Sequence, residues 1–297
     1  MESPSPTALR VPGVNPRKRQ LARLLDRAGA LHMLLRAQAR WNGPYLRCVN
    51  YHSVPPAWAD DFARQLVWLR EHFVPVGLSD LLELHAGRWP HARPGILVSF
   101  DDGCRTHAEV AAPLLEEHGF VGWFFVTAGF PDVPVAEQAA FAREHAISAC
   151  SADGDPRVAL TWDQVRHLDR RHVVGCHTLE HVRLSRDVGE AELRRQIVGG
   201  KQRLEEQLGH PVDTFAWVGG EEWSYSAPAA RLIAEAGFRV ALGTNNQPYR
   251  PGRDLLRIER TNVEAFYEPE LLRFQLCGVL DLAYAPKRRR LRRALAG

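Results

Sequence analysis

The stretch of sequence that decides the fold is Gly95-Ile96-Leu97-Val98-Ser99-Phe100-Asp101-Asp102-Gly103. Its apolar first part, from Gly95 to Phe100, predicts a buried strand. Two adjacent carboxylates, Asp101 and Asp102, follow directly at the carboxyl end of that strand. Asp-Asp-Gly is also ordinary turn chemistry, so this stretch alone leaves a structural and a functional interpretation open.

On both sides of this stretch, short apolar runs alternate with helical patterns. Such alternation is typical of mostly parallel strands covered by helices, arranged as a barrel or as an open sheet. Residues from about 130 to 156 break the rhythm and are expected to form an insertion. The predicted strands are 46–50, 95–100, 121–126, 172–176, 214–218 and 239–242, and the predicted helices are 62–71, 107–118, 190–208 and 227–236.

Two basic segments flank this body of about 46–265. Residues 1–45 are expected to form an N-terminal extension, in which leucines at helical spacing over 17–39 predict one amphipathic basic helix packed on the body. Residues 266–297 are expected to form a C-terminal helix and a basic tail, which reads Lys-Arg-Arg-Arg-Leu-Arg-Arg over 287–293. A solvated face is the default for both, and peripheral contact with an anionic membrane is the alternative.

Composition limits the class of protein. A chain of 297 residues with 45% hydrophobic composition can bury a large core, which argues against disorder. The Pro-rich start lacks the apolar stretch of a secretory signal, so we expect a cytoplasmic protein, free or held peripherally on the inner face of the membrane. The five scattered cysteines predict reduced thiols. The net charge of +3 sits mainly at the two ends, so no nucleic-acid partner is expected.

A second polar motif, His177-Thr178-Leu179-Glu180-His181, follows the predicted strand at 172–176. Histidines four residues apart on one helical turn can point both imidazoles at one ion, although thirteen histidines make chance pairs common. Together, Asp102, His177 and His181 would supply one oxygen and two nitrogens to a divalent cation. Asp101 beside them would act as general base on the attacking water, so these residues predict a metal-dependent hydrolase.

The sequence resembles the polysaccharide deacetylases of the NodB-homology type, also grouped as carbohydrate esterase family 4. The resemblance covers about 46–262, in the family's order and spacing. It is carried by Ser99-Phe100-Asp101-Asp102-Gly103, Trp123-Phe124-Phe125-Val126-Thr127, Leu160-Thr161-Trp162-Asp163-Gln164-Val165 and His177-Thr178-Leu179-Glu180-His181 with Leu184-Ser185. It implies a deformed TIM-like (β/α) barrel and metal-dependent removal of an N-acetyl group, with Asp101 as catalytic base and Asp102, His177 and His181 as metal ligands.

The catalytic acid departs from the commonest family pattern. Many members use a histidine near the C-terminal end of the barrel, and this chain has none after His210. Asn50-Tyr51-His52-Ser53-Val54 resembles the Tyr-His motif that one branch carries on its first strand, which implies His52 as the acid. The metal is expected to be Zn²⁺, and Co²⁺, Ni²⁺ or Fe²⁺ would accept the same ligands.

The family's third motif, aromatic-Pro-aromatic-Gly, reads Phe215-Ala216-Trp217-Val218-Gly219-Gly220 here and lacks the proline. The backbone N–H of Gly219 is still expected to bind the oxyanion. Trp217 or Trp223 is expected to stack on a sugar ring, with a place in the core as the alternative.

Two charged motifs extend the expected site. Leu255-Leu256-Arg257-Ile258 resembles a stretch whose arginine orients the base, which implies Arg257 in that role, with a surface salt bridge as the alternative. Glu221 and Glu222 are expected either to face an amino-bearing ligand or to lie in a solvated loop.

The expected substrate is an N-acylated amino sugar inside the cell, which is lipid-linked, nucleotide-linked or part of a secondary metabolite. One alternative is hydrolysis of a non-sugar amide, formamide or imide at the same metal site. Another is a degenerate family member that binds a glycan without turnover, which the altered third motif would explain. The sequence gives no indication of the oligomeric state.

Overall fold

The computed structural model describes residues 14–147 and 155–295, and its strands in these ranges belong to one sheet. Neighbouring strands pair in parallel, in the order β8-β7-β6-β5-β4-β3-β1-β9, and β2 pairs with β3. The strands are β1 Leu46–Tyr51, β2 Val74–Pro75, β3 Gly95–Phe100, β4 Gly122–Val126, β5 Val173–Cys176, β6 Thr214–Ala216, β7 Val240–Gly243, β8 Ile258–Glu259 and β9 Thr261–Asn262.

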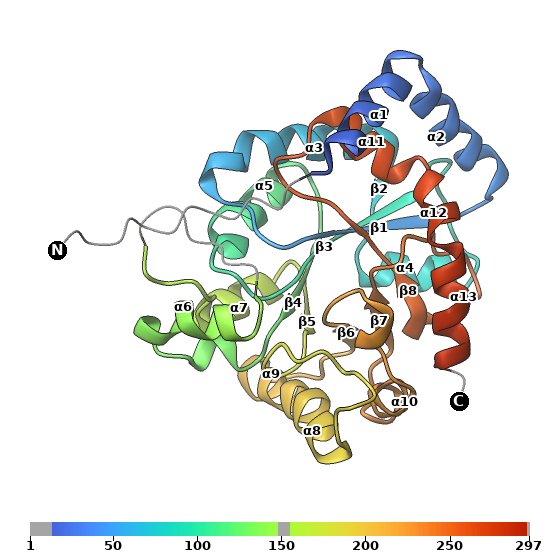
Figure 1. The fold of residues 1–297 in the computed structure, drawn as a ribbon. Coiled ribbons are helices and arrows are strands. Elements are labelled where there is room, and N and C mark those ends of the chain that lie inside the picture. The colour runs from blue at the N-terminus through green and yellow to red at the C-terminus, as the bar shows by residue number, and fades with distance from the viewer. Residues whose placement is uncertain (1–13, 148–154, 296–297) are drawn as a thin grey trace.

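Helices surround this sheet on its outer side (Figure 1). Their alternation with parallel strands confirms the predicted α/β fold, a deformed TIM-like barrel. The helices are α1 Pro16–Arg27, α2 Ala30–Trp41, α3 Ala59–His72, α4 Leu78–His85, α5 Ala112–Glu117, α6 Val135–Glu144, α7 Trp162–Asp169, α8 Glu190–Arg194, α9 Gly200–Leu208, α10 Ala227–Glu235, α11 Pro269–Leu276, α12 Val279–Ala283 and α13 Ala285–Ala294.

The barrel nearly closes through the short segment that joins β8 to β9. β8 pairs with β7 and β9 pairs with β1, so residues 258–262 connect the two ends of the strand order. Arg260 lies between these two strands and donates its backbone N–H to the carbonyl of Gly243 at 2.9 Å. This arginine is therefore fully buried at the point where the barrel closes.

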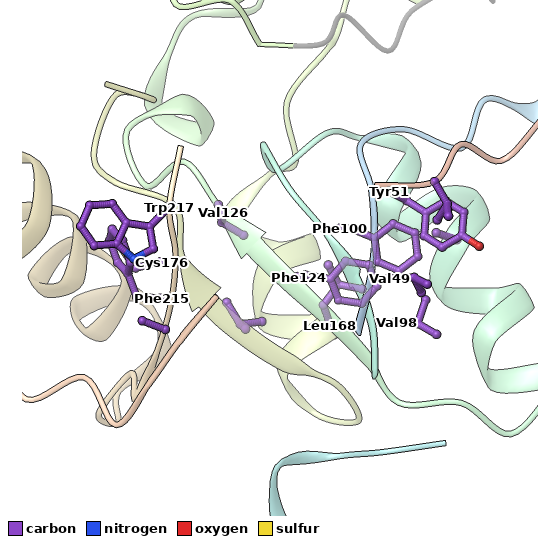
Figure 2. Close-up of a cluster of buried hydrophobic side chains, with 14 of the residues drawn as sticks. Val49, Tyr51, Val98, Phe100, Phe124, Val126, Leu168, Cys176, Phe215 and Trp217 are labelled. Carbon is purple, nitrogen blue, oxygen red and sulfur yellow. The ribbon is translucent and has the colours of Figure 1, made fainter. Parts of the chain in front are cut away.

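Alternation along the strands divides the core into two layers. Leu97 of β3 shares a cluster with Cys48 of β1 and Leu242 of β7. Because β7 and β3 are not neighbours in the strand order, their side chains can meet only in the interior of the barrel. Val98 and Phe100 belong instead to the cluster that lies between the sheet and the helices, part of which Figure 2 shows. Every second side chain of β3 therefore points into the barrel, which applies to Leu97 and, beyond it, to residues 99 and 101.

The N-terminal extension forms two helices, and the single helix expected over 17–39 is wrong. α1 ends at Arg27 and α2 begins at Ala30, because Gly29 between them takes a left-handed backbone conformation with φ 72°. α1 packs on α11 through a small apolar cluster and through an ion pair between Arg273 and Asp26 at 2.7 Å. The extension is thus fixed to the C-terminal helices.

The C-terminal segment holds three helices, so the expectation of one helix and a basic tail is wrong. The basic run forms most of α13, where the guanidinium of Arg288 donates to the carbonyls of Asn245 at 2.9 Å and Asn246 at 2.6 Å. Lys287 donates to the carbonyl of Gly220. Backbone carbonyls therefore hold the basic run against the body.

The expected insertion contains a short 3-10 turn at Phe130–Asp132 and helix α6, while residues 148–154 lie outside the described ranges. Its apolar side chains, which include Phe130 and Ala142, form a separate small cluster with Val158 and Ala159. Among the described helices of the chain, none has the length and apolarity that crossing a membrane requires.

Candidate active site

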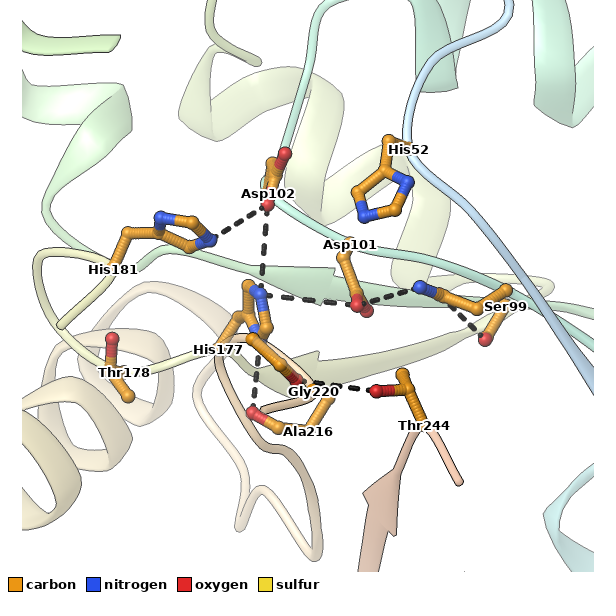
Figure 3. A network of polar contacts seen from close by, with 12 residues as sticks. His52, Ser99, Asp101, Asp102, His177, Thr178, His181, Ala216, Gly220 and Thr244 are labelled. Atoms are coloured by element: carbon orange, nitrogen blue, oxygen red, sulfur yellow. Dashed lines mark hydrogen bonds and ion pairs between the residues drawn. The ribbon is translucent and has the colours of Figure 1, made fainter. Parts of the chain in front are cut away.

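The carboxyl ends of three strands bring the predicted polar residues together on one side of the barrel (Figure 3). His52, Asp101 and His177 are each the first residue after a strand, namely β1, β3 and β5. Because parallel strands end on the same side and each residue keeps the inward phase of its strand, the three side chains face one another.

Three hydrogen bonds fix the carboxylate of Asp101. Arg260 donates from Nη1 to Oδ1 at 2.6 Å and from Nη2 to Oδ2 at 2.9 Å, and Asn50 Nδ2 donates to Oδ2 at 2.9 Å. Burial alone would raise the pKa of Asp101, but the charge of Arg260 outweighs it and leaves this pKa below its ordinary value. Asp101 is therefore an oriented carboxylate at neutral pH, which is the form a general base needs.

Asp102, His177 and His181 each offer one ligand atom, and these atoms lie within 4.8 Å of one another. Nε2 of His181 is 3.1 Å and Nε2 of His177 is 3.6 Å from Oδ1 of Asp102. All three side chains are nearly inaccessible to solvent. One oxygen and two nitrogens suit a divalent cation and leave coordination positions for other ligands.

Backbone carbonyls orient both imidazoles. Nδ1 of His177 bonds the carbonyl of Ala216 at 2.9 Å, and Nδ1 of His181 bonds the carbonyl of His145 at 2.6 Å. Since a carbonyl only accepts, each Nδ1 carries a proton, which leaves Nε2 as the atom of each ring that can bind a metal. Burial lowers the pKa of His177 to about 4, which keeps its imidazole neutral. The donor set therefore fits a metal ion.

The two histidines lie on a tight loop, and the expectation of a helical turn is wrong. Residues 177–181 form turns in which Thr178 (φ 64°) and His181 (φ 59°) have left-handed backbone conformations. Such conformations cost about 1–3 kcal/mol each in residues other than glycine. Asp102 is also left-handed, with φ 81°. Strained backbone therefore gathers at the candidate ligands, as it does at many functional sites.

His52 faces Asp101 and Asp102 from the end of β1 (Figure 3). Its Nδ1 lies 3.8 Å from Oε1 of Glu264, two residues past β9. Burial alone would lower the pKa of His52, but the Glu264 carboxylate and the two aspartates raise it to about 9. The imidazole is therefore protonated at neutral pH, as a catalytic acid must be.

His107 is a buried residue that the sequence analysis did not identify. Its Nε2 bonds the backbone carbonyl of His52, and its ring lies 5.4 Å from the ring of Phe100 and 5.7 Å from that of Phe124. Burial lowers the pKa of His107 to about 4, so the neutral ring donates to that carbonyl. His107 thereby fixes the backbone that carries His52, across 55 residues of sequence.

Gly219, the expected oxyanion donor, lies on the loop after β6 with φ +79°. A Cβ atom there would come within 2.8 Å of Oε2 of Glu221 and 2.9 Å of Nε of Arg183. Those two atoms belong to flexible side chains that can move, so the left-handed backbone conformation is what favours glycine. These facts explain the residue type, and the oxyanion role stays a prediction.

Trp217 is placed away from the candidate site, which contradicts its expected stacking on a sugar. Its side chain is 5% exposed and packs in the outer layer against Phe215 and Tyr225, with ring centroids 6.0 Å and 5.0 Å away. The reason is strand phase, because Ala216 faces the barrel interior and the next residue faces the helices.

Arg257 does not contact Asp101, and the contact expected of it is made by Arg260. Nε of Arg257 lies 3.3 Å from Oδ2 of Asp254 in an exposed ion pair. Ile258 faces the barrel interior, so Arg260 shares its phase and reaches the base whereas Arg257 does not. Alternation from Ile258 is the sequence signal that could have identified Arg260.

The acidic residues after the third motif are paired within the chain. Glu221 lies 3.4 Å from Arg183, and Glu222 accepts from Nε of Arg290 at 2.9 Å. These surface pairs favour the solvated-loop alternative, and recognition of an amino-bearing ligand stays a prediction. Trp223 beside them is 58% exposed, with the guanidinium of Arg183 5.5 Å from its ring centre.

One cysteine departs from the predicted reduced state. Cys48, Cys176 and Cys277 are free and buried, whereas Cys104, two residues after Asp102, is disulfide-bonded. The fifth cysteine, Cys150, lies outside the described residues. The expectation of five reduced thiols is therefore wrong, and a disulfide is typical of oxidising compartments.

Known proteins resemble this chain in both sequence and fold. The model of the polysaccharide deacetylase family matches residues 90–241. The poly-beta-1,6-N-acetyl-D-glucosamine N-deacetylase of Escherichia coli K12 is 25% identical over 150 residues, which are 47% of this chain and 21% of that relative. The match therefore spans about a fifth of the relative's length.

Two solved structures share the fold. Deacetylase PplD of Streptococcus pyogenes, in complex with acetate, aligns with a TM-score of 0.61 at 17% identity and covers 77% of this chain and 97% of its own. IcaB from Ammonifex degensii aligns with a TM-score of 0.61 at 21% identity. The alignment covers 80% of this chain and 97% of the IcaB chain. Because the family match extends over more than half of the sequence and includes both the aspartate pair and the histidine pair, the chain belongs to the polysaccharide deacetylase family.

Proposed function

We propose that this chain is a metal-dependent deacetylase that hydrolyses the amide bond of an N-acylated amino sugar. One observation carries the proposal: the Nε2 atoms of His177 and His181 converge on Asp102, directly beside the fixed carboxylate of Asp101. Such a set serves a hydrolytic reaction, because a protein that only binds glycan has no use for an oriented base beside a cation site.

The residues that would hold the cation are Asp102, His177 and His181. Zn²⁺ is the first choice, and Co²⁺, Ni²⁺ or Fe²⁺ suit the same donors. When bound, the ion supplies Lewis acidity that polarises the acyl carbonyl and lowers the pKa of water. The chain's own contribution is to aim both imidazoles, because the carbonyls of Ala216 and His145 accept from Nδ1 and leave Nε2 facing Asp102.

Two proton transfers fall to side chains on neighbouring strand ends. Asp101 takes a proton from the attacking water, because Arg260 keeps it ionised and oriented. His52 gives a proton to the sugar nitrogen as the carbon–nitrogen bond breaks, because Glu264 keeps the imidazole protonated. The products are a carboxylic acid and a free amine, and the two residues exchange protons with solvent before the next cycle.

The substrate we propose is an N-acyl amino sugar carried on a lipid or a nucleotide in the cytoplasm. The Escherichia coli relative is named as an N-deacetylase of poly-beta-1,6-N-acetyl-D-glucosamine, a polymer of an N-acetyl amino sugar. Trp223 is the exposed aromatic side chain beside the altered third motif, so it replaces Trp217 as our candidate for stacking on the sugar. The Cys104 disulfide argues against a cytoplasmic location, which makes the thiol state a direct test of this part.

A second candidate activity is hydrolysis of a non-sugar amide or imide at the same cation site. The altered third motif favours it, because Trp217 is buried behind β6 and the motif's proline is absent. A protein that binds glycan without turnover is the remaining alternative.

The test combines metal content with acid release from a substrate panel. The panel holds free, nucleotide-linked, lipid-linked and polymeric N-acetyl amino sugars, together with simple amides and imides. Wild type should hold about one metal ion per chain and release acetate from an amino sugar, while Asp101→Asn and His52→Ala should keep the metal and lose turnover. Absence of bound metal would overturn the proposal, and release only from imides would select the second activity.

A further inference from the structure

The two N-terminal helices carry a large share of the protein's exposed apolar surface. Nine large apolar side chains are exposed in the described part of the chain, and five of them lie on α1 and α2, which have 12 residues each. Trp41 is 82% exposed, and Leu24 and Met33 are each 65% exposed. Such clustering is typical of a surface that contacts another phase or molecule. The five are Leu21, Leu24, Met33, Leu34 and Trp41.

The basic residues of the same helices fall into two groups. Arg19 and Arg23 face α11, where they pair with Glu268 and Glu270 at 3.1 Å and 3.2 Å. A second group is exposed and has no ion-pair partner among the described residues. Its members are Arg17, Arg27, Arg36 and Arg40. The inner arginines therefore fasten the helices to the body, and the outer ones leave net positive charge on the surface.

Helical spacing interleaves the outer arginines with the exposed apolar residues. In α1, residues 17, 21, 24 and 27 recur every three or four positions and share one face. In α2, residues 33, 36 and 40 do the same, with Trp41 beside them. The opposite side buries Ala22 and Leu31 in the cluster shared with α11, and Figure 1 shows the pair at the edge of the molecule.

We propose that this outer surface is a docking site for an anionic lipid bilayer. We call it the hairpin face, and it consists of Arg17, Leu21, Leu24, Arg27, Met33, Leu34, Arg36, Arg40 and Trp41. Helices that lie in a membrane interface are rich in Lys and Arg and carry Leu and Trp side chains that enter the headgroup region. Tryptophan prefers that depth, and arginine pairs with lipid phosphate.

The charge of the hairpin face selects a bilayer over a second copy of the chain. A two-fold contact would bring this surface against itself, so that its four outer arginines would meet four like charges. The only acid of α1 and α2, Asp26, is already paired with Arg273. An anionic lipid surface instead supplies the missing negative charge and a place for the apolar side chains.

The connection to the barrel makes the attachment rigid. α2 ends at Trp41, and β1, which leads to His52, begins at Leu46. The guanidinium of Arg47 on β1 donates to Asp281 of α12 and to Gln38 of α2, which fixes the end of α2 to the body. Access to a lipid-linked sugar would follow from such docking, and that step alone rests on the proposed function.

The test is co-sedimentation of the full chain with lipid vesicles. Wild type should bind vesicles that contain phosphatidylglycerol, more weakly as salt rises, and should bind pure phosphatidylcholine poorly. The double variants Leu24→Gln/Trp41→Ser and Arg36→Gln/Arg40→Gln should each lose about tenfold in affinity. Matched controls away from the hairpin face are Val67→Gln, at an exposed apolar residue, and Arg186→Gln, at an exposed arginine. Both should bind as wild type does.

Thermal melts and light scattering keep the outcomes distinct. Asp101→Asn should bind vesicles as wild type does, so loss of catalysis and loss of docking are separate results. The proposal is wrong if folded wild type does not bind anionic vesicles, or if the two double variants of the hairpin face bind them as tightly as the control variants do. A dimer that Leu24→Gln/Trp41→Ser dissociates would assign the face to a second copy instead.

Discussion

The guanidinium of Arg260 donates hydrogen bonds to both carboxylate oxygens of Asp101, at 2.6 Å and 2.9 Å, although 159 positions separate the two residues in the sequence. The same arginine lies where β8 and β9 join the two ends of the barrel. The residue at the closure of the barrel therefore also orients the carboxylate that we propose as the base, so an error in closure would also displace that carboxylate.

Replacing this arginine should damage both stability and catalysis. Arg260→Gln leaves the Asp101 carboxylate buried without its cation, which should cost about 3–5 kcal/mol in the free energy of unfolding. Burial would then raise the pKa of Asp101, and because the base acts deprotonated, the acidic limb of kcat/KM should move to higher pH. Denaturant unfolding and a pH–rate profile measure the two effects.

Arg257→Gln is the matched control, since its exposed pair with Asp254 should contribute less than about 0.5 kcal/mol. Its pH–rate profile should match that of wild type. If Arg257→Gln shifted the acidic limb and Arg260→Gln did not, our assignment of the orienting arginine would be wrong.

The pair of His52 and Glu264 should set the alkaline limb. His52 acts protonated, so activity should fall as pH rises through its pKa of about 9. Glu264→Gln removes the carboxylate that raises this pKa, so the limb should move to lower pH while metal content stays constant. His52→Ala should reduce kcat by about 10²–10⁴-fold. An unmoved alkaline limb in Glu264→Gln would remove His52 as the acid.

The predicted positions of site residues were correct where the alternation of side chains along a strand alone decides which way a residue faces. Asp101 and His177 directly follow apolar runs, and a strand's inward phase carries over to the next residue. The barrel fold follows from the same alternation of runs and helical patterns. The same alternation explains the position of Trp217. Ala216 faces the barrel interior, so the next residue, Trp217, faces the helices and not the candidate site.

Other parts of the site depend on contacts that no local pattern encodes. Glu264 and His107 reach His52 only after β9 pairs with β1 and the loop after β3 folds back on β1. The histidine loop could not be predicted either, because left-handed Thr178 and His181 contradict the helical reading of their spacing. Their conformations are stabilised by tertiary bonds, such as the one from Ala128 N–H to the Thr178 carbonyl at 3.0 Å.

Metal binding should depend on the two buried histidines and not on histidine content. His177→Ala and His181→Ala should each abolish stoichiometric metal binding, because two ligands rarely hold a divalent cation tightly. His210→Ala, at an exposed histidine paired with Asp169, should retain about one ion per chain. Elemental analysis after dialysis measures all three, and metal retained by both buried-site variants would refute this ligand set.

The cysteines give a test of the compartment that needs no substrate. Cys48, Cys176 and Cys277 are free and Cys104 is bonded, so unfolded protein purified without reductant should show fewer reactive thiols than the five that it shows after reduction. Because the bonded Cys104 lies two residues from Asp102, reduction should also loosen the loop after β3 and lower the melting temperature. Five thiols before reduction would mean that the bond does not form in the purified protein, which would favour the reducing cytoplasm that the sequence predicted. Fewer than five thiols in protein isolated from its native source would instead place the chain in an oxidising compartment, and the substrate would then be sought among glycans outside the cytoplasm.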